Sequence, residues 1–238
     1  MKPLLTANWH NLIMLNYEID PSALNDYLPP GTELDLWNNK CYISLVAFEF
    51  LNAKLKKIRI PFYKNFEQIN LRFYARRNCN GDVRKGVVFI KEIAMGNLLK
   101  AGAALLYNEF YTNLPTRRSM IQKDKIIHFK YEWRFNKSWH YIEADAFPDK
   151  KIPAADTLEA FITERYWGYT KLSNNRTAEF RVDHPQWKIS TLQTAKLNCN
   201  SYDLYGEMLH NYLSKTPVAA FVADGSFVEV HNRCVYSI

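Results

Sequence analysis

Three polar side chains recur at every second position between residues 70 and 74. They are Asn70, Arg72 and Tyr74, and apolar residues separate them. Alternate residues of a β-strand point to the same face of a sheet, so these three share one face. An arginine on that face can hold a carboxylate through two parallel hydrogen bonds. The face either lines a polar cavity that binds an anionic ligand or lies open to solvent, and the pattern alone does not decide.

Two charged residues, Lys91 and Glu92, follow the apolar run at residues 87–90. A buried lysine has a lowered pKa and can form an imine with a carbonyl compound. More often, a lysine at a strand end extends to water. Glu92 is either a buried acid with a raised pKa or the partner of an arginine, and pairing is favoured. We add Glu92 to Asn70, Arg72 and Tyr74 as candidate ligand-binding residues.

Local motifs for cofactors and metals are absent from the sequence. There is no GxGxxG, P-loop, HExxH or GxSxG, and no two of the six histidines lie within four residues. The four cysteines form no CxxC pair, which favours reduced thiols in a cytoplasmic protein. We expect no cofactor and no metal, although a metal site built from distant residues stays open. His184 is either a general base or, more commonly, a structural histidine at a turn.

The clearest local element is a β-hairpin around Asn80-Gly81. This dipeptide favours a two-residue turn because both positions adopt positive φ. With this turn, two residues face each other across the hairpin when their residue numbers add up to 161. The predicted apolar face has three pairs, which are Phe73 with Val88, Leu71 with Ile90, and Ile69 with Glu92. Lys91 falls on the opposite face, beside Asn70.

The remaining elements are mostly strands. Strand-like stretches cover residues 9–18, 41–51, 126–135, 139–147, 177–182 and 187–197. A second hairpin is predicted to turn at Asp224-Gly225, between residues 218–223 and 226–230. Helices are predicted at residues 21–28, at 157–166 with Asp156 as the cap, and at 201–213. Many strands with few helices indicate an α+β fold, mainly antiparallel β.

Length and charge limit the classes of protein that fit. The 238 residues suit a single domain, residues 1–238, and no stretch approaches the ~20 apolar residues of a membrane span. The net charge is +7, and residues 54–100 hold 12 Lys/Arg but only 3 Asp/Glu. We expect no nucleic-acid partner because no nucleic-acid motif accompanies this charge. Self-association into a homo-oligomer stays open.

An ordered set of short stretches carries a family resemblance. They are residues 9–19 (WHNLIMLNYEI), 27–32 (YLPPGT), 42–48 (YISLVAF), 70–74 (NLRFY), 86–93 (GVVFIKEI), 106–111 (LYNEFY), 161–170 (FITERYWGYT), 182–187 (VDHPQW), 204–206 (LYG) and 223–226 (ADGS). Together they resemble the uncharacterised YqjF-like bacterial family, a domain of unknown function in the acetoacetate decarboxylase-like superfamily. The resemblance implies a duplicated β-cone or barrel, with a few peripheral helices and a central cavity.

The resemblance also implies where chemistry would occur. Acetoacetate decarboxylases use a lysine that forms a Schiff base, with its pKa lowered by an adjacent lysine. The corresponding segment is residues 107–112 (YNEFYT), which places Tyr111 and Thr112 at the two lysine positions. No lysine lies between Ala101 and Thr116. Tyr107 then becomes a candidate ligand-binding residue, and Glu109 and Tyr111 become candidate acid–base groups.

Two main hypotheses follow. The first is a protein whose central cavity binds a small anionic or carbonyl-bearing metabolite without a Schiff-base lysine. The alternative is a lyase or hydrolase that acts on a small keto acid through Glu109, Tyr111 or Lys91.

Overall fold

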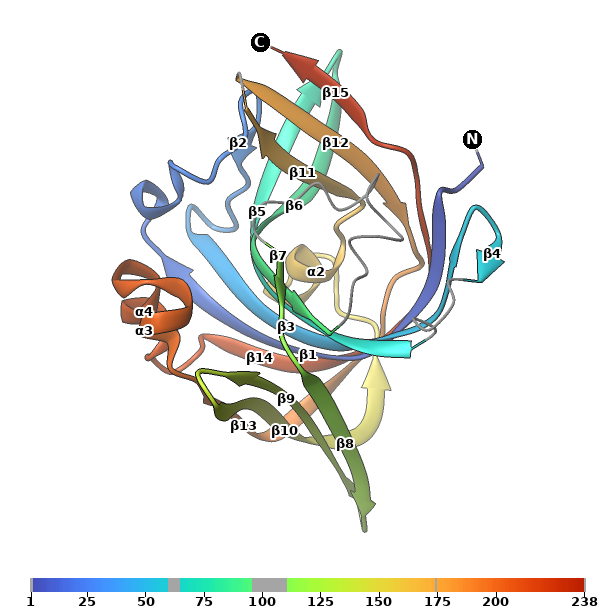
Figure 1. The fold of residues 1–238 in the computed structure, drawn as a ribbon, viewed down its shortest axis with the longest axis vertical. Coiled ribbons are helices and arrows are strands. Elements are labelled where there is room, and N and C mark those ends of the chain that lie inside the picture. Colours follow the sequence, from blue (N-terminus) through green and yellow to red (C-terminus); the bar gives the residue numbers. More distant parts are fainter. Residues whose placement is uncertain (1, 60–64, 96–110, 174, 238) are drawn as a thin grey trace.

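A computed structural model describes residues 2–59, 65–95, 111–173 and 175–237 of the chain (Figure 1). Fifteen strands in this described part belong to one sheet. Seven of them form the body of the fold, namely β1 (Leu5–Ile19), β3 (Cys41–Leu55), β5 (Asn65–Cys79), β6 (Asp82–Ala94), β11 (Trp167–Leu172), β12 (Arg176–Asp183) and β14 (Ala219–Val230). Four more extend the sheet, namely β8 (Thr116–Lys123), β9 (Ile126–Phe135), β10 (Ser138–Lys151) and β13 (Ile189–Asn198). Short strands complete it, namely β2 (Glu33–Leu34), β4 (Ile58–Arg59), β7 (Tyr111–Asn113) and β15 (Cys234–Ser237).

Four short helices occur among the described residues. They are the 3₁₀-helix η1 (Pro21–Leu24) and the α-helices α2 (Leu158–Thr163), α3 (Ser201–Tyr205) and α4 (Glu207–Leu213). Most neighbouring strands are antiparallel, and the parallel pairs are β6 with β11 and β6 with β7. The fold class predicted from the sequence, mainly antiparallel β with a few helices, is therefore confirmed.

The seven body strands close into a ring. They follow the order β12, β11, β6, β5, β3, β1 and β14, and a short antiparallel pairing of β14 with β12 closes the path. The other long strands continue from β14 as a separate arm, β13–β10–β9–β8. Figure 1 shows this arm leaving the ring and α2 lying near the ring's centre. The result is a ring of strands and not a regular barrel.

Apolar side chains cover both faces of the ring strands. The outer cluster packs β1, β3, β5 and β6 against the arm and against α3 and α4, and it includes Leu45, Leu71, Trp133 and Leu209. The inner cluster fills much of the ring interior and includes Met14, Phe48, Tyr74 and Trp187. Buried sheets of this kind have apolar residues on consecutive positions, as β3 does. A site inside the ring must therefore be built from the inner face.

The hairpin of β5 and β6 contains a β-bulge that the sequence does not reveal. The predicted pairs hold near the turn, where Phe73 faces Val88. The register then shifts, because Arg72 pairs with Phe89 but Leu71 pairs with Lys91, which leaves Ile90 as the extra residue. Beyond the shift Ile69 faces Ile93, and Asn70 faces Glu92. The predicted pairs Leu71–Ile90 and Ile69–Glu92 are wrong because one extra residue reverses the side-chain direction of all later residues.

Other local predictions also need correction. Asp224 and Gly225 do not turn a hairpin; they lie inside β14, which pairs with β1 on both sides of them. The predicted helix at 201–213 is two helices, interrupted at Gly206, which has a φ of 86°. The side chain of Thr157, and not that of Asp156, caps α2. The helix predicted at 21–28 ends at Leu24.

The placement of Gly225 gives a test of the ring. Its φ is 75°, and an added Cβ would lie 2.0 Å from the backbone oxygen of Trp9 on β1. Gly81 is a matched control, because its φ is 90° and an added Cβ would meet nothing within 4 Å. We expect Gly81→Ala to lower the free energy of unfolding by about 1 kcal/mol and Gly225→Ala by more than about 2 kcal/mol. Urea denaturation measures both, and equal losses would contradict the close contact of β1 with β14.

Candidate functional site

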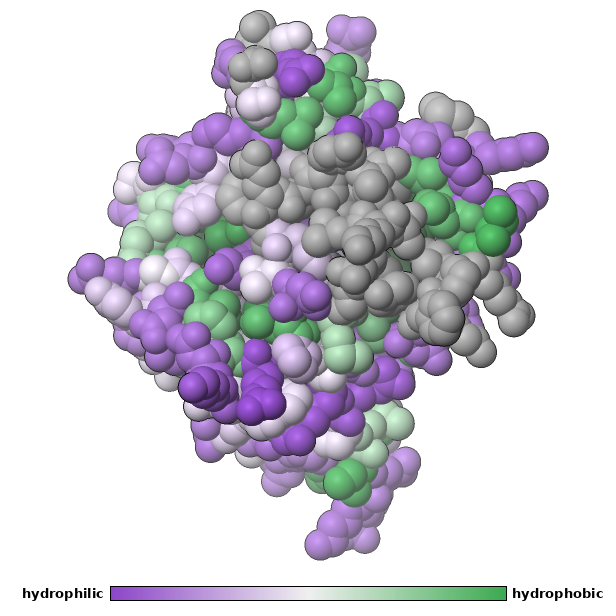
Figure 2. Space-filling view, in the orientation of Figure 1, coloured by the Kyte–Doolittle hydropathy of each residue, from purple (hydrophilic) through white to green (hydrophobic). Residues whose placement is uncertain are grey.

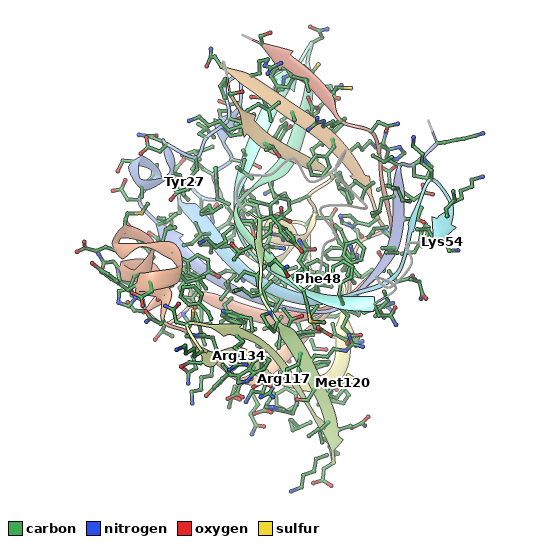
Figure 3. The ribbon with its side chains drawn as sticks, viewed as in Figure 1. Tyr27, Phe48, Lys54, Arg117, Met120 and Arg134 are labelled. Atoms are coloured by element: carbon green, nitrogen blue, oxygen red, sulfur yellow. The ribbon has the colours of Figure 1, made fainter. Side chains whose placement is uncertain are left out.

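A cavity of about 110 Å³, measured as the space open to the centres of water-sized molecules, lies inside the ring. All seven ring strands, together with β7, contribute side chains to its wall. Its polar lining includes Gln68, Asn70, Arg72, Glu92, Tyr111, Thr163, Arg165 and His184. Its aromatic lining includes Trp9, Phe48, Phe50, Phe66, Phe89, Trp167, Phe180 and Trp187. Figure 3 shows Phe48 within the ring, whereas Arg117 and Met120 lie out on the arm.

Arg72 is the cationic group of the cavity that lacks a counter-ion. Its side chain lines the cavity, and the residue is 7% exposed. One terminal nitrogen, Nη2, donates a long hydrogen bond of 3.5 Å to the backbone oxygen of Ile162 in α2. Its Nε atom has no partner among the described residues, and no carboxylate there forms an ion pair with it. Burying an unpaired charge costs free energy, so this arrangement favours an anionic ligand.

The neighbouring Arg165 is held differently. Its Nη1 forms an ion pair with Asp35, which is also buried. Its Nε donates a hydrogen bond of 2.5 Å to the backbone oxygen of Phe161, and its guanidinium lies 3.9 Å from the Phe161 ring centre. Burial lowers the pKa of Arg165, and Asp35 opposes that shift. The charge of Arg165 is therefore neutralised by Asp35, whereas no described carboxylate neutralises that of Arg72.

A row of polar side chains runs along β5 on the cavity side. Gln68, Asn70 and Arg72 occupy alternate positions, and Glu92 joins them from β6 because the bulge turns it toward the cavity. Gln68 Nε2 donates a hydrogen bond of 2.6 Å to Glu92 Oε1. The Oδ1 atom of buried Asn70 has no partner in the part of the chain described here. The row thus offers a cation, amides and a carboxylate to one ligand.

The side chain of Tyr74 points to the same face of β5 as those of Asn70 and Arg72, but it lies behind the cavity wall. Its ring packs against Phe161 of α2, with ring centres 5.2 Å apart. Its hydroxyl shares a hydrogen bond with that of Ser44, and Ser44 Oγ donates to Asn16 Oδ1 at 2.6 Å. Tyr74 is fully buried and is absent from the described lining. The helix α2 therefore covers the position that strand alternation assigns to the cavity.

The segment implied by the family resemblance is described only in part. Tyr111 begins β7, lies opposite Glu92 and lines the cavity. Its hydroxyl donates a hydrogen bond of 3.3 Å to the backbone oxygen of Ala94. Tyr107 and Glu109 lie outside the described residues. The structure thus brings Tyr111 to the same wall as Asn70, Arg72 and Glu92.

Lys91 faces away from the cavity because of the bulge. Its Nζ donates a hydrogen bond of 2.6 Å to the backbone oxygen of Leu204 in α3. Burial lowers the pKa of Lys91. The predicted position beside Asn70 on the cavity face is therefore wrong. An imine on Lys91 would form outside the ring.

His184 lines the cavity but is fixed by its surroundings. Its ring stacks between Tyr166 and Trp187, with ring centres 4.8 and 4.3 Å away. Its Nδ1 lies 2.9 Å from the oxygen of Pro185, and its Nε2 lies 3.1 Å from that of Arg165. Burial lowers the pKa of His184, and the two backbone carbonyl oxygens oppose that shift. Both nitrogens face carbonyl oxygens, which supports the structural interpretation over that of a general base.

One group among the described residues has the geometry for a metal ion. The candidate ligand atoms of Asp183, Glu229 and His231 lie within 4.8 Å of one another, where β12 meets β14. Arg181 Nε lies 2.6 Å from one Asp183 oxygen, and His231 Nε2 lies 2.7 Å from the other. These contacts already satisfy the Asp183 carboxylate. The group is explained as an ion-pair network that joins the two strands closing the ring.

Some lining residues were missed from the sequence. Gln68 precedes Asn70 by two positions, so strand alternation could have identified it. The aromatic residues of β3 alternate in the same way at Phe48 and Phe50. Arg165 lies in the connection between α2 and β11. The periodicity of the sequence gives no indication that this residue lies near β5. Its pairing with Asp35 depends on the tertiary fold alone.

Comparison with known proteins places the chain in a family. The model of DUF2071, a family of uncharacterised conserved proteins, matches residues 6–226. The chain belongs to this family. It is 25% identical to the uncharacterised protein YqjF of Bacillus subtilis strain 168 over 203 residues, which cover 83% of this chain and 79% of YqjF. The resemblance identified from the sequence is confirmed.

Solved structures show the same fold. Acetoacetate decarboxylase from Legionella pneumophila superimposes with a TM-score of 0.67 at 10% identity, covering 99% of this chain and 88% of the decarboxylase. The enduracididine biosynthesis enzyme MppR in complex with pyruvate gives a TM-score of 0.61 at 11% identity, covering 99% of this chain and 91% of MppR. The acetoacetate decarboxylase-like fold is therefore established for this chain. Among its described residues, no helix has the length and apolar character to cross a membrane.

The contrast between the two buried arginines gives a stability prediction. Arg72→Met removes an unneutralised buried charge, so we expect the free energy of unfolding to rise by about 1–3 kcal/mol. Arg165→Met leaves Asp35 buried without its partner, so we expect a fall of about 3–5 kcal/mol. Urea denaturation at pH 7 without added ligand measures both changes. A loss of stability in Arg72→Met as large as in Arg165→Met would mean that Arg72 has a counter-ion within the chain.

Proposed function

We propose that this protein binds a small anionic or carbonyl-bearing metabolite, a carboxylate above all, inside the ring cavity. The observation that carries the proposal is the buried guanidinium of Arg72, which has no carboxylate partner among the described residues. A ligand carboxylate would supply the missing counter-charge through a charge-assisted hydrogen bond, the strong class of such bonds. Folding has already dehydrated and positioned the arginine, so binding does not have to order it.

Two further features support this proposal. Asn70 adds an amide beside Arg72, so the ligand meets polar groups along one edge and apolar side chains around the rest. Among proteins of the same fold, MppR is described in complex with pyruvate, which is a small keto acid. In the proposed site no imine forms, because Lys91 points away and residues 107–112 contain no lysine.

The basic stretch at residues 54–100 is better explained by ion pairs than by nucleic acid. Arg77 and Arg84 both bind the buried carboxylate of Glu179, at 2.5 and 2.7 Å. Arg76 pairs with Glu33 on the surface. Three of the twelve basic residues of this stretch, Arg76, Arg77 and Arg84, are therefore paired within the protein, and Arg72 lies inside the ring. This favours a small ligand over a nucleic-acid partner.

Calorimetry with purified protein tests the proposal. We expect acetate, pyruvate and acetoacetate to bind, and acetamide, which has no charge, to bind at least tenfold more weakly than acetate. Arg72→Met should weaken carboxylate binding by roughly 10- to 150-fold, because a hydrogen bond between charged groups is worth about 1.5–3 kcal/mol. Lys130→Met removes one positive charge from the arm and serves as the matched control. Carboxylate binding that survives Arg72→Met unchanged would refute the proposal.

An enzyme is the second candidate, a lyase or hydrolase acting on a small keto acid. Tyr111 favours it, since this residue lies opposite Glu92 on the cavity wall and could exchange a proton with a bound keto acid. Glu109 remains part of this hypothesis. Proton NMR of acetoacetate incubated with the protein would detect turnover, and Tyr111→Phe should abolish it. Borohydride trapping should give no adduct on Lys91, and an adduct there would require the lysine to enter the cavity.

A further inference from the structure

The cavity has chemically different ends. Along β5 the cavity-facing positions run from Arg72 through Asn70 and Gln68 to Phe66. Strands rise about 3.3 Å per residue, so Arg72 and Gln68 are roughly 13 Å apart along the strand. On β3 the facing residues change in the same direction, because Ser44 lies beside Arg72 whereas Phe50 lies beside Phe66. Both strands therefore go from polar to aromatic.

The aromatic end is a packed set of rings, which we define as Trp9, Phe48, Phe50 and Phe66. The ring centres of Trp9 and Phe48 are 5.4 Å apart, and those of Phe50 and Phe66 are 4.6 Å apart in a stacked arrangement. All four line the cavity. Such rings bury large apolar areas and are suited to contact an apolar part of a ligand. Among the described lining residues, no lysine or arginine lies with these four rings.

Among the described lining residues, a second carboxylate on the ligand would find no second unpaired guanidinium. Arg165 is the other buried guanidinium of the lining that the structure describes, and Asp35 already neutralises it. The described residues therefore offer a position for one negative charge, at Arg72.

These features narrow the ligand class. We infer that the preferred ligand is a monocarboxylate with a short apolar chain or a single ring, whose carboxylate binds Arg72 and whose tail packs against the aromatic end. This inference rests on the proposed function and names the class of ligand for the same cavity. The cavity volume of about 110 Å³ limits the buried part of the ligand to a small group. A carboxylate without an apolar tail would make no contact with the aromatic end.

A ligand series tests the inference by calorimetry. The series is acetate, butanoate, pentanoate, phenylacetate, pyruvate and succinate. We expect affinity to rise about fourfold for each methylene from acetate to pentanoate, which follows from the free energy of burying a CH₂ group. Phenylacetate should bind at least as tightly as butanoate, and succinate should bind more weakly than butanoate despite its similar length.

Two variants test where the apolar tail of the ligand lies in the cavity. Ala94 lies on β6 opposite Gln68 and lines the cavity near Phe66. Ala94→Leu should fill the space for the tail and reduce the preference for pentanoate over acetate at least tenfold. Phe66→Leu, a milder change, should reduce the preference for phenylacetate over acetate. Circular dichroism should show both variants folded, and Lys130→Met on the arm should keep both preferences unchanged.

The outcomes separate the inference from the proposed function. If no carboxylate binds, or if binding is insensitive to Arg72→Met, the proposed function fails and the inference with it. If carboxylates bind through Arg72 but acetate, pyruvate or succinate binds as tightly as pentanoate and phenylacetate, the inference is overturned and the proposed function stands. A rising affinity along the series that Ala94→Leu abolishes supports both.

Discussion

The site depends on one electrostatic constraint, the burial of Arg72 without a counter-ion in the described chain. A guanidinium in a region of low dielectric constant loses its hydration and regains little of it from a single carbonyl contact at 3.5 Å. The fold must compensate for the unfavourable free energy of burying Arg72 through other interactions. It does so through two apolar clusters on the opposite faces of the same strands. A residue that costs stability and remains in an otherwise apolar interior is characteristic of a binding site.

The described surroundings of Arg72 supply no counter-ion. The buried acid Asp35 is paired with Arg165. Glu92 belongs to the same cavity but accepts its hydrogen bond from Gln68, and it forms no ion pair with Arg72. The face seen in Figure 2 is largely hydrophilic, with hydrophobic residues in small separate groups. Inside the ring, by contrast, apolar side chains line the cavity next to Arg72, whose guanidinium has no carboxylate partner among the described residues.

Simple periodicity in the sequence predicts much of this arrangement. Alternation along residues 70–74 and the turn signal at Asn80-Gly81 correctly predict the hairpin, its sheet faces near the turn, and the shared face of Asn70 and Arg72, but alternation does not decide between a cavity and solvent for that face. Alternation fails where the backbone departs from a regular strand. The bulge at Ile90 exchanges the directions of Lys91 and Glu92, and no residue type marks it in advance. Tyr74 has the predicted direction, but α2, which comes from a segment some 85 residues later, covers it.

Long-range pairing is the part that sequence periodicity cannot supply. The pairing of Asp35 with Arg165 joins segments 130 residues apart, and it decides which of two buried arginines is left for a ligand. The family resemblance correctly predicts the fold, but it says nothing of this choice. In an acetoacetate decarboxylase the chemistry depends on a lysine, whereas here the wall around Tyr111 offers a phenol, a carboxylate and an arginine. These groups can bind and orient a carboxylate and can move a proton, but they cannot form an imine.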